Sequence, residues 1–480
     1  MSNAEDDEYE DFLLIIAFYH LLHDQLDEEH DEIHRAYDEL LKEERKRQRS
    51  YPVEKDIRSW QQFADSVDDA HFRRMFRMPR PTFDLLCTSI CDAVGVENFR
   101  PECSIENNSV KSKNAEALLY LGGLIPGEMK VALGIRMLAG GSYLDLVPLF
   151  NVSKSHLYSV FDEFLQWIMS TLQFPLVQWI RNRDWDQLKT LANEFTEKTG
   201  GVFHGPFGDL DGLAIRVRSP TLKEVSDPGN YYCRKGFFAL NVQAICDKRK
   251  RFLWCYPSNK GSTHDSAAFA NSRLNDLLQE VAEELHSLGI FIAADSAYGL
   301  TSYLIVPYDS DQIKKADEHQ AKAMDAFNFY LSSCRIYIEC AFGELIMRWG
   351  IFWRTLRFKL KKCQAIIQVA MLLQNFIVDN RDGTAQDQYE QQYFRKFNMP
   401  TRTVLQTHLT ETTGEVPRAL VTDNNEPHPG GRPTINEKQL RQTGEQVRHS
   451  LMVQLSTHNH ERPLQHEMHY NSCGHIYMTS

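Results

Sequence analysis

The sequence predicts a mixed α/β protein in which a helical N-terminal module precedes a domain built on a sheet. Before residue 180, apolar residues recur at three- and four-residue spacing, which is the period of amphipathic helices. From about residue 205 the apolar residues alternate, as they do in strands, and these strands are then followed by helical stretches. After residue 380 the chain is rich in Gln, Thr, Asn, His and Pro with little apolar periodicity, which is typical of disorder.

We therefore divide the 480 residues into four parts. These parts are an acidic N-terminal helical arm over 1–75, a helical module over 76–180, an α/β domain over 200–380 and a polar, largely disordered tail over 381–480. The net charge of −12 comes mainly from the arm, because residues 1–50 hold 16 acidic and 6 basic residues, against 49 and 47 in the other 430. The body is thus nearly neutral with local basic clusters, so the acidic total does not exclude a nucleic-acid partner.

Composition also excludes several classes of protein. No apolar run reaches the roughly 18–20 residues that span a bilayer, and the first ten residues are acidic where a signal peptide is basic. The ten cysteines form no CxxC pair, which argues against a zinc ribbon or a disulfide framework. The sequence therefore predicts reduced thiols, no membrane partner and a place in the nucleus or cytoplasm.

The helical module is expected to contain a helix-turn-helix-like pair. Helices are predicted over 127–138 and 143–150, and after a short turn Ser153 can cap a longer helix that begins at Lys154. A short helix, a tight turn and a longer helix are the pattern in which the start of the second helix faces the major groove. The polar residues that would read DNA are then Lys154, Ser155, His156 and Ser159. The alternative is a purely structural pair of antiparallel helices.

The α/β domain is expected to begin with a strand that Asp211 opens and that runs through Val217. The further expected elements are strands over 237–246, 251–256 and 290–294, helices over 266–288, 302–307 and 328–349, and a polar loop over 309–325. Residues 248–250 form the turn between the second and third strands. One helix is expected in the tail, over 437–455.

Three acids stand at positions that could converge. Asp211 lies on the first strand, Asp295 directly follows the buried strand 290–294, and Glu339 lies in an apolar stretch of the long helix. A carboxylate in such surroundings is costly unless it is paired or coordinated. Three of them suggest a cage for Mg²⁺ or Mn²⁺, and two such ions can activate a water for phosphodiester cleavage. The alternative is that each acid is a hydrogen-bonded structural residue.

Several strings in the chain occur in an order that is specific to one family. These strings are Leu210-Asp211-Gly212, residues 232–244 (YCRKGFFALNVQA), residues 261–266 (GSTHDS), Asp295-Ser296-Ala297-Tyr298, Pro307-Tyr308, and the set Asn328, Ser333, Arg335, Glu339, Phe342-Gly343 and Arg348. With them the region 76–379 resembles the Harbinger-type transposases and their domesticated relatives, which are DDE superfamily endonucleases. The resemblance implies a ribonuclease H-like catalytic domain with a two-metal site. Its carboxylate triad falls on Asp211, Asp295 and Glu339, which would be both the catalytic residues and the metal ligands.

The chain departs from the family pattern near the first acid. Leu213 and Ala214 stand where the family usually has Thr and His, and Asp209 on the same strand face is an alternative first ligand. Asp265 is an alternative second metal ligand, although it could instead cap the helix that follows it. The 43 residues between Asp295 and Glu339 are more than is common in such triads, and the expected polar loop would hold the excess.

Basic residues near the third acid are candidates for DNA binding. Arg335 precedes Glu339 by one helical turn, so it can pair with the carboxylate or hold a phosphate. The basic run that follows contains the candidate DNA contacts Arg348, Arg354, Arg357 and Lys359, together with Lys361 and Lys362. Interleaved aromatic residues fit either a DNA-backbone track or a solvated face over core aromatics. Arg234, Lys235 and residues 248–251 could form a second track.

Together these observations predict a metal-dependent DNA endonuclease or transposase that cleaves phosphodiester bonds and transfers strands. The alternative is a domesticated, inactive DNA-binding or regulatory protein that keeps the fold. The expected partner is double-stranded DNA, and the expected assembly is a homo-oligomer. The family resemblance also implies a Myb-like DNA-binding partner protein. A basic cluster over 42–49 is either a nuclear-import patch or a solvated helix end.

Overall fold

The computed structural model describes residues 60–99, 125–150, 152–381, 435–457, 468–470 and 476–478. The acidic arm up to residue 59, with its basic cluster over 42–49, lies outside these residues. Within the described ranges, no helix combines the length and the apolar character that crossing a membrane requires.

The first described part of the chain is a helical module, and it begins at Trp60, inside the arm expected over 1–75. Its helices are α2 (Trp60–Asp65), α3 (Asp69–Phe76), α4 (Arg80–Val94), α5 (Val96–Phe99), α7 (Gly127–Leu138), α8 (Tyr143–Phe150) and α9 (Lys154–Thr171). The long helix α9 packs against α4, α7 and α8. At the crossing of α7 and α9, a Cβ on Gly134 would lie 2.2 Å from the ring of Phe164. A glycine is therefore needed at this position for the two helices to come this close.

The expected pair of helices around the turn at residue 152 is confirmed at the level of secondary structure. Helix α8 ends at Phe150 and α9 begins at Lys154. The Ser153 side chain accepts a hydrogen bond from the His156 backbone N–H at 3.2 Å, so it caps α9 as predicted. Whether this pair reads DNA stays a prediction.

A five-stranded mixed sheet forms the centre of the second part. Its strands are β1 (Pro206–Arg216), β2 (Ala239–Cys246), β3 (Phe252–Lys260), β4 (Phe291–Ala294) and β5 (Leu304–Ile305), in the order β3-β2-β1-β4-β5. The pairs β1–β2 and β2–β3 are antiparallel, whereas β4 is parallel to both β1 and β5. The predicted hairpin and the predicted strand near 290–294 are thus confirmed. The first strand, however, begins at Pro206, so Asp211 lies in its middle.

Helices cover both faces of this sheet. On one face, α10 (Leu176–Asn182), α11 (Trp185–Lys198), α12 (Asp265–Ala270), α13 (Arg273–Glu280) and α14 (Ala282–Leu288) contribute to a core that includes Leu210, Ile245 and Ile292. On the other face, α16 (Glu318–Arg348) and α17 (Leu360–Asp379) pack over Val242 and Ala293. Since α10 and α11 pack with the sheet, the α/β part begins before residue 200.

Three expectations for the α/β domain are wrong. The single helix expected over 266–288 is three short helices, because Ser272 starts a new helix by capping the backbone N–H of Asn275. The stretch 302–307 contains strand β5, since it pairs with β4. The segment 309–325 is helical for most of its length, as α15 (Ser310–Lys315) and the start of α16.

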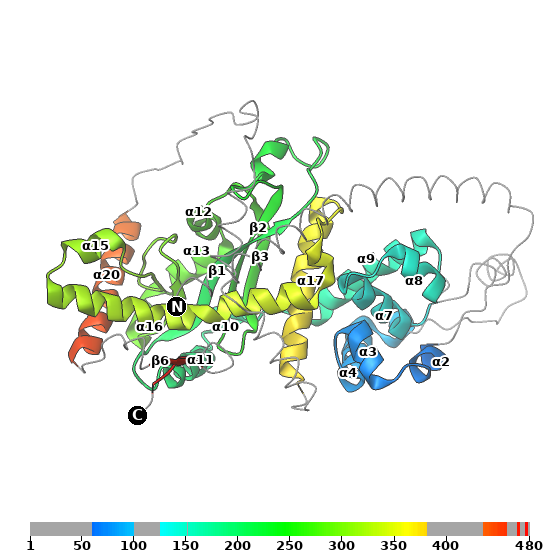
Figure 1. Ribbon diagram of the computed structural model, residues 1–480, viewed down its shortest axis with the longest axis horizontal. Coiled ribbons are helices and arrows are strands. Elements are labelled where there is room, and N and C mark those ends of the chain that lie inside the picture. Colours follow the sequence, from blue (N-terminus) through cyan, green and yellow to red (C-terminus); the bar gives the residue numbers. More distant parts are fainter. Residues whose placement is uncertain are drawn as a thin grey trace, which may run out of the picture.

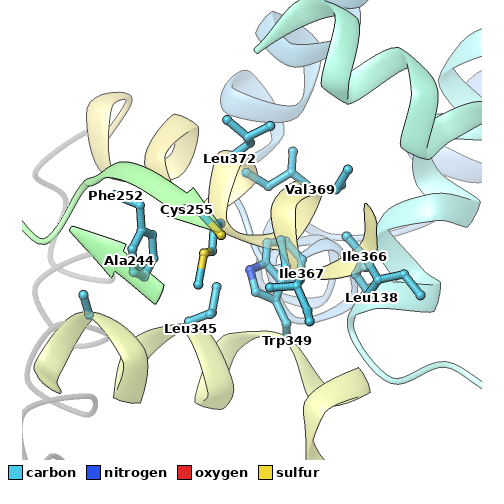
Figure 2. Packing of buried hydrophobic residues seen from close by; sticks show 14 of the residues in the cluster. Leu138, Ala244, Phe252, Cys255, Leu345, Trp349, Ile366, Ile367, Val369 and Leu372 are labelled. Atoms are coloured by element: carbon cyan, nitrogen blue, oxygen red, sulfur yellow. The ribbon is translucent and has the colours of Figure 1, made fainter. Parts of the chain in front are cut away.

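Helix α17 joins the two parts of the protein. It packs on α9 and on β3, and it contacts α16 (Figure 1). Trp349, at the end of α16, is completely buried. Figure 2 shows Trp349 and Ile367 packed between α16 and α17, with Leu138 of α7 nearby. A single apolar core therefore runs from the helical module to the sheet.

One helix of the tail docks on the sheet domain. Helix α20 (Ile435–Thr457) confirms the helix expected over 437–455, and it packs on α16 and β5 (Figure 1). It buries Leu440, Met452 and Leu455, and Arg448 donates a hydrogen bond to the Pro307 carbonyl at 3.2 Å. The short strands β6 (Met468–Tyr470) and β7 (Ile476–Met478) pair with each other.

Candidate active site and nucleic-acid interface

The candidate acids of β1 and β4 lie on the same face of the sheet. In the parallel pairing, Asp209 stands opposite Ala293 and Leu210 opposite Ala294. Asp211 lies two residues after Asp209, and Asp295 lies two residues after Ala293. Because side chains alternate along a strand, both acids belong to the face that α16 covers. Asp211 is 5% exposed and Asp295 is partly exposed.

Helix α16 brings the third candidate acid to this face. Arg335 and Glu339 are one helical turn apart, so both side chains project from the same side of α16. The Nη1 atom of Arg335 lies 3.7 Å from Oδ1 of Asp295. Burial raises the pKa of Asp209 on β1, and the charge of Glu339 adds to this effect, so Glu339 lies near Asp209. The structure thus brings all three triad candidates and Arg335 to one region.

Asp209 is deeper in the molecule than Asp211. It has no exposed surface, and neither of its carboxylate oxygens has a hydrogen-bond partner among the described residues. Burial raises its pKa well above the usual value, although Arg335 opposes this and Asp247 and Glu339 add to it. Burial therefore favours the neutral form of Asp209, whereas a metal ligand must be an ionised carboxylate. This difference favours Asp211 over Asp209 as the first ligand.

The candidate ligands fit a divalent cation by their chemistry. All three are carboxylates, which Mg²⁺ and Mn²⁺ prefer, and they reach the same face from two strands and a helix. In the part of the chain that the structure covers, however, no three acidic, His or Cys side chains are close enough to hold a metal ion together. Arg335 stands beside Asp295 in this arrangement. Closing the site around a metal therefore requires a local rearrangement of these side chains.

Asp265, the alternative second ligand, lies on the opposite face of the sheet. Its Oδ1 accepts hydrogen bonds from Nδ2 of Asn241 at 3.0 Å and from Nε2 of Gln243 at 2.9 Å. Gln243 pairs with Gly212, and a Cβ on Gly212 would lie 2.3 Å from the Asp265 carboxylate. Gly212 and Leu210 share one face of β1, which is not the face of Asp211.

The expected capping role of Asp265 is wrong. His264 occupies the N-cap position of α12, and Asp265 is the first residue inside the helix. Its carboxylate belongs to a polar network in which Tyr298 also donates a hydrogen bond to Gln243 at 2.6 Å. The backbone N–H of Tyr298 bonds to the Asp295 carbonyl at 3.0 Å, so this network lies directly behind the Asp295 turn. The sequence shows the order of the motifs that contain Asp265 and Asp295, but only the strand register shows on which face of the sheet each motif lies.

The predicted reading positions of α9 lie at the surface. Ser155, His156 and Ser159 are exposed, while Leu157 and Val160 pack inward. The Lys154 ammonium lies 4.0 Å from the centre of the Tyr143 ring. The pKa of His156 is lowered by desolvation and by the charge of Lys130, so its imidazole is mainly neutral at neutral pH. These side chains are accessible to a ligand at the start of α9.

The basic run after α16 divides into buried and exposed residues. Arg348 is buried and donates a hydrogen bond to the Arg77 carbonyl at 2.8 Å, so its expected role in DNA binding is wrong: it holds α16 to the helical module. Arg335 is also buried, at 9% exposure, and lies within the site. Arg354, Arg357 and Lys359 are exposed.

The basic turn over 248–251 is largely neutralised by acids. Lys250 pairs with the buried Glu344, Arg251 with Asp247 and Asp379, Arg249 with Asp379, and Lys248 with Glu197. The carboxylate of Glu344 also bonds Arg381, and these cations together lower its pKa against the effect of burial. The turn therefore fastens the hairpin to α16 and α17, and it is a poor candidate for a DNA track. Sequence reasoning missed Glu344, because its partners are 30 to 94 residues away.

Comparisons with known proteins agree with this architecture. Residues 210–375 match the DDE superfamily endonucleases, a span that includes Asp211, Asp295 and Glu339. The chain is 24% identical over 343 residues to "Protein ALP1-like" of Arabidopsis thaliana, covering 68% of this chain and 75% of that protein. No solved structure matches the chain significantly. The predicted resemblance is thereby confirmed for the DDE superfamily endonucleases, over residues 210–375.

Proposed function

Because residues 210–375 match the DDE superfamily endonucleases, we propose that the chain is a DNA endonuclease that depends on Mg²⁺ or Mn²⁺. The observation that carries the proposal is the common face of Asp211, on β1, and Asp295, directly after the adjacent parallel strand β4, with Arg335 and Glu339 reaching it from α16. Carboxylates on two strands and a helix are the kind of ligand set that a two-metal nuclease uses.

The catalytic domain is proposed to be ribonuclease H-like. Three antiparallel strands followed by two strands parallel to the first, with helices on both faces, support this assignment. In it, Asp211, Asp295 and Glu339 hold the ions, which when bound supply Lewis-acid stabilisation of the phosphate and activation of the attacking oxygen. Water as the attacking group gives hydrolysis, and a DNA 3′-hydroxyl gives strand transfer.

Arg335 has two roles in this proposal. In the free protein it pairs with Asp295 and so lowers the cost of gathering carboxylates in a half-buried region. With DNA bound, its guanidinium can donate two parallel hydrogen bonds to a phosphate, which a single ammonium could not do. The side chain would then orient the scissile group next to the acids.

Duplex DNA is the proposed substrate. The start of α9, where Ser155 and His156 are exposed and Lys154 is partly exposed, supports a helix-turn-helix-like reading of bases. The exposed Arg354, Arg357 and Lys359 support contacts with phosphates. The nucleus as location, a homo-oligomer and a Myb-like partner protein belong to the same proposal. The location rests on composition, and the Myb-like partner rests on the resemblance.

A second candidate function is a DNA-binding or regulatory protein that has lost cleavage. The specific observation in its favour is the ion pair of Arg335 with Asp295, in a described structure where no three ligands are gathered. A catalytically inactive site would keep the Arg335–Asp295 ion pair in all states. An active site must exchange it when metal and DNA bind.

Nicking of supercoiled plasmid, with and without Mg²⁺ or Mn²⁺, separates the two functions. We expect nicking that requires the metal and that disappears in Asp211→Asn, while binding of the same DNA remains. A donor oligonucleotide with a free 3′-hydroxyl in the same reaction reports strand transfer as joined product. Metal-independent nicking, or nicking that survives in Asp211→Asn, would reject the proposed site. Binding without any nicking by the wild type would favour the second function.

A further inference from the structure

Three segments that are separate in the sequence are joined beyond the end of β1. Leu356 exchanges backbone hydrogen bonds with Arg216 and Arg218, and Val217 bonds to Phe238 at 2.9 Å. Phe238 in turn forms a bridge with Tyr232. The segments 216–224, 231–238 and 354–361 thus lie next to each other, and we call them the β1 extension.

Glu224 fixes the same arrangement from the side. Its carboxylate accepts hydrogen bonds from the Leu360 backbone N–H at 3.2 Å, from Arg218 at 2.7 Å and from Thr221 at 3.1 Å. It therefore holds the loop after β1 against the start of α17. On the other side, the Arg216 guanidinium lies 4.4 Å from the centre of the Phe237 ring. The relative positions of the three segments are thus set by specific contacts.

The β1 extension is strongly basic. Its basic residues are Arg216, Arg218, Lys223, Arg234, Lys235, Arg354, Arg357, Lys359 and Lys361, and Glu224 is its one acid. Arg234, Lys235 and Arg354 are exposed, and none of the three forms an ion pair with another described residue. This distinguishes them from residues 248–251 at the other end of the hairpin, which acids neutralise. The structure thus separates two basic clusters that look alike in the sequence.

The position of the β1 extension relates it to the candidate active site. Asp211 and Arg216 stand on the same strand, five residues apart, which at about 3.3 Å per residue is roughly 17 Å. One strand of duplex DNA advances about 3.4 Å per nucleotide, so this distance corresponds to about five base pairs. Exposed aromatic side chains, Tyr232 in the extension and Trp353 beside it, border the basic residues.

We propose that the β1 extension binds the backbone of duplex DNA about five base pairs from the phosphate at the active site. This rests on the proposed function for the position of the cut, although binding itself does not require cleavage. The extension would act as a clamp that holds the flanking duplex in register with the acids. Its contacts are with phosphates, so it is insensitive to DNA sequence.

The test compares two triple variants with the same loss of charge. Arg234→Gln, Lys235→Gln and Arg354→Gln remove three exposed charges of the extension. Lys248→Gln, Arg249→Gln and Lys314→Gln remove three charges that are already paired. Binding of the full chain to a 30-base-pair duplex is measured by fluorescence anisotropy at several salt concentrations. Each lost phosphate contact should reduce the log–log salt slope by about 0.9, so the extension variant should lose up to about 2.7 and bind at least tenfold more weakly. The control should keep the wild-type slope.

Several outcomes would overturn the proposal. Equal slopes in the two triple variants would do so, provided both unfold at the wild-type temperature. If the extension variant unfolds at a lower temperature than the wild type, the double variant Lys359→Gln with Lys361→Gln is the second test. An unchanged salt slope in this double variant would also overturn the proposal. Tighter wild-type binding to single-stranded RNA than to duplex DNA would assign the surface to a different partner.

Asp211→Asn separates this proposal from the proposed function. The extension predicts that this variant binds duplex with the wild-type slope, whether or not the wild type cleaves. A photo-crosslinking amino acid in place of Lys235 should mark nucleotides that flank the nick made by the wild type. Loss of the slope difference overturns the clamp, while loss of metal-dependent nicking with an intact slope difference overturns only the nuclease.

Discussion

Arg335 and Asp295 form an ion pair, with Nη1 of Arg335 3.7 Å from Oδ1 of Asp295, and this pair stands where the candidate metal site would assemble. The arginine comes from the same face of α16 as Glu339. Helix α16 therefore supplies both a carboxylate for a metal and a cation that competes with the metal for Asp295. The relative affinity of Asp295 for Arg335 and for the metal decides whether Asp295 is available as a metal ligand.

Removing the arginine should change metal binding and cleavage in opposite directions. In Arg335→Gln, the free protein should bind Mn²⁺ several-fold more tightly, because a like charge next to the ligands is gone. Nicking should nevertheless fall about tenfold or more, since the bidentate contact to phosphate is lost. Calorimetry of Mn²⁺ binding and a plasmid assay measure the two effects. Arg335→Lys should regain metal competition but little of the cleavage, and weaker Mn²⁺ binding in Arg335→Gln would contradict this role.

The triad itself predicts the largest losses of activity. Asp211→Asn, Asp295→Asn and Glu339→Gln should each reduce metal-dependent nicking by at least about 100-fold, because each removes a carboxylate that the ions require. Asp311→Asn, in an exposed ion pair with Lys314, is the matched control and should be neutral. Nicking rates at saturating Mn²⁺ are the measurement. If Asp295→Asn cleaves normally while Asp265→Asn is inactive, the second ligand has been misassigned.

Asp209 and Asp211 can be told apart by the same assay. Asp209 is fully buried, and its oxygens lack hydrogen-bond partners in the described structure. Asp209→Asn should therefore keep most of the cleavage, and stability should not fall, because a buried carboxyl is exchanged for a neutral group of the same shape. Thermal unfolding and nicking are measured side by side. A dead but well-folded Asp209→Asn would make Asp209 the first ligand.

Much of the secondary structure follows from local sequence. The cap at Ser153, the hairpin turn over 248–250 and the buried strand 291–294 each carry a short-range signal, and all three were found. Strand β5 was missed because its two residues are strands only through pairing with β4. The early start of α16 was missed although Asp317 caps it through the backbone N–H of Gln320, which is a local signal.

The site divides in the same way. The acids could be chosen from the sequence, because a carboxylate beside buried strand residues is unusual. The side of the sheet on which each acid lies could not be predicted, because it depends on the pairing of Asp211 with Ala244 and of Gly212 with Gln243. For the same reason, Arg348 looked like a DNA contact until its hydrogen bond to the Arg77 carbonyl was seen. Burial of a long basic side chain depends on distant partners.

Glu224 gives a pH-dependent prediction for the β1 extension. Burial alone would raise its pKa, but hydrogen bonds from Thr221, Arg218 and Leu360 outweigh it and lower the pKa to about 2. A folded-state pKa below the unfolded value means that the stabilisation is complete above about pH 4.5 and is lost as the pH falls towards 2. Glu224→Gln should destabilise the protein by about 1–2 kcal/mol at pH 7, and less at pH 3. Denaturant unfolding at both pH values tests this, and an equal loss at both would contradict it.

Helix α20 should stabilise the sheet domain although it comes from the tail. A Cβ on Gly444 would lie 2.5 Å from the Thr301 carbonyl oxygen, so Gly444→Ala should push α20 away from the segment that leads into β5. Burial of Leu440, Met452 and Leu455 is worth several kcal/mol in total, and part of it should be lost. A lower unfolding temperature than in the exposed control Gln446→Ala is expected. Equal temperatures would mean that α20 contributes little to the fold.

The start of α9 should govern specificity and leave the chemistry intact. Ser155 and His156 are exposed next to the Ser153 cap, and Leu157 anchors the helix in the core. If these residues read base edges, Ser155→Ala with His156→Ala should reduce discrimination between a selected site and random duplex about tenfold or more, because each base contact is worth about 1–3 kcal/mol. Metal-dependent nicking of random plasmid should persist, since the acids lie on β1, directly after β4 and on α16. Competition binding at fixed salt is the measurement, with Ser170→Ala near the far end of α9 as the control. A double variant with full discrimination would make α8 and α9 a structural pair and move target choice to a partner protein.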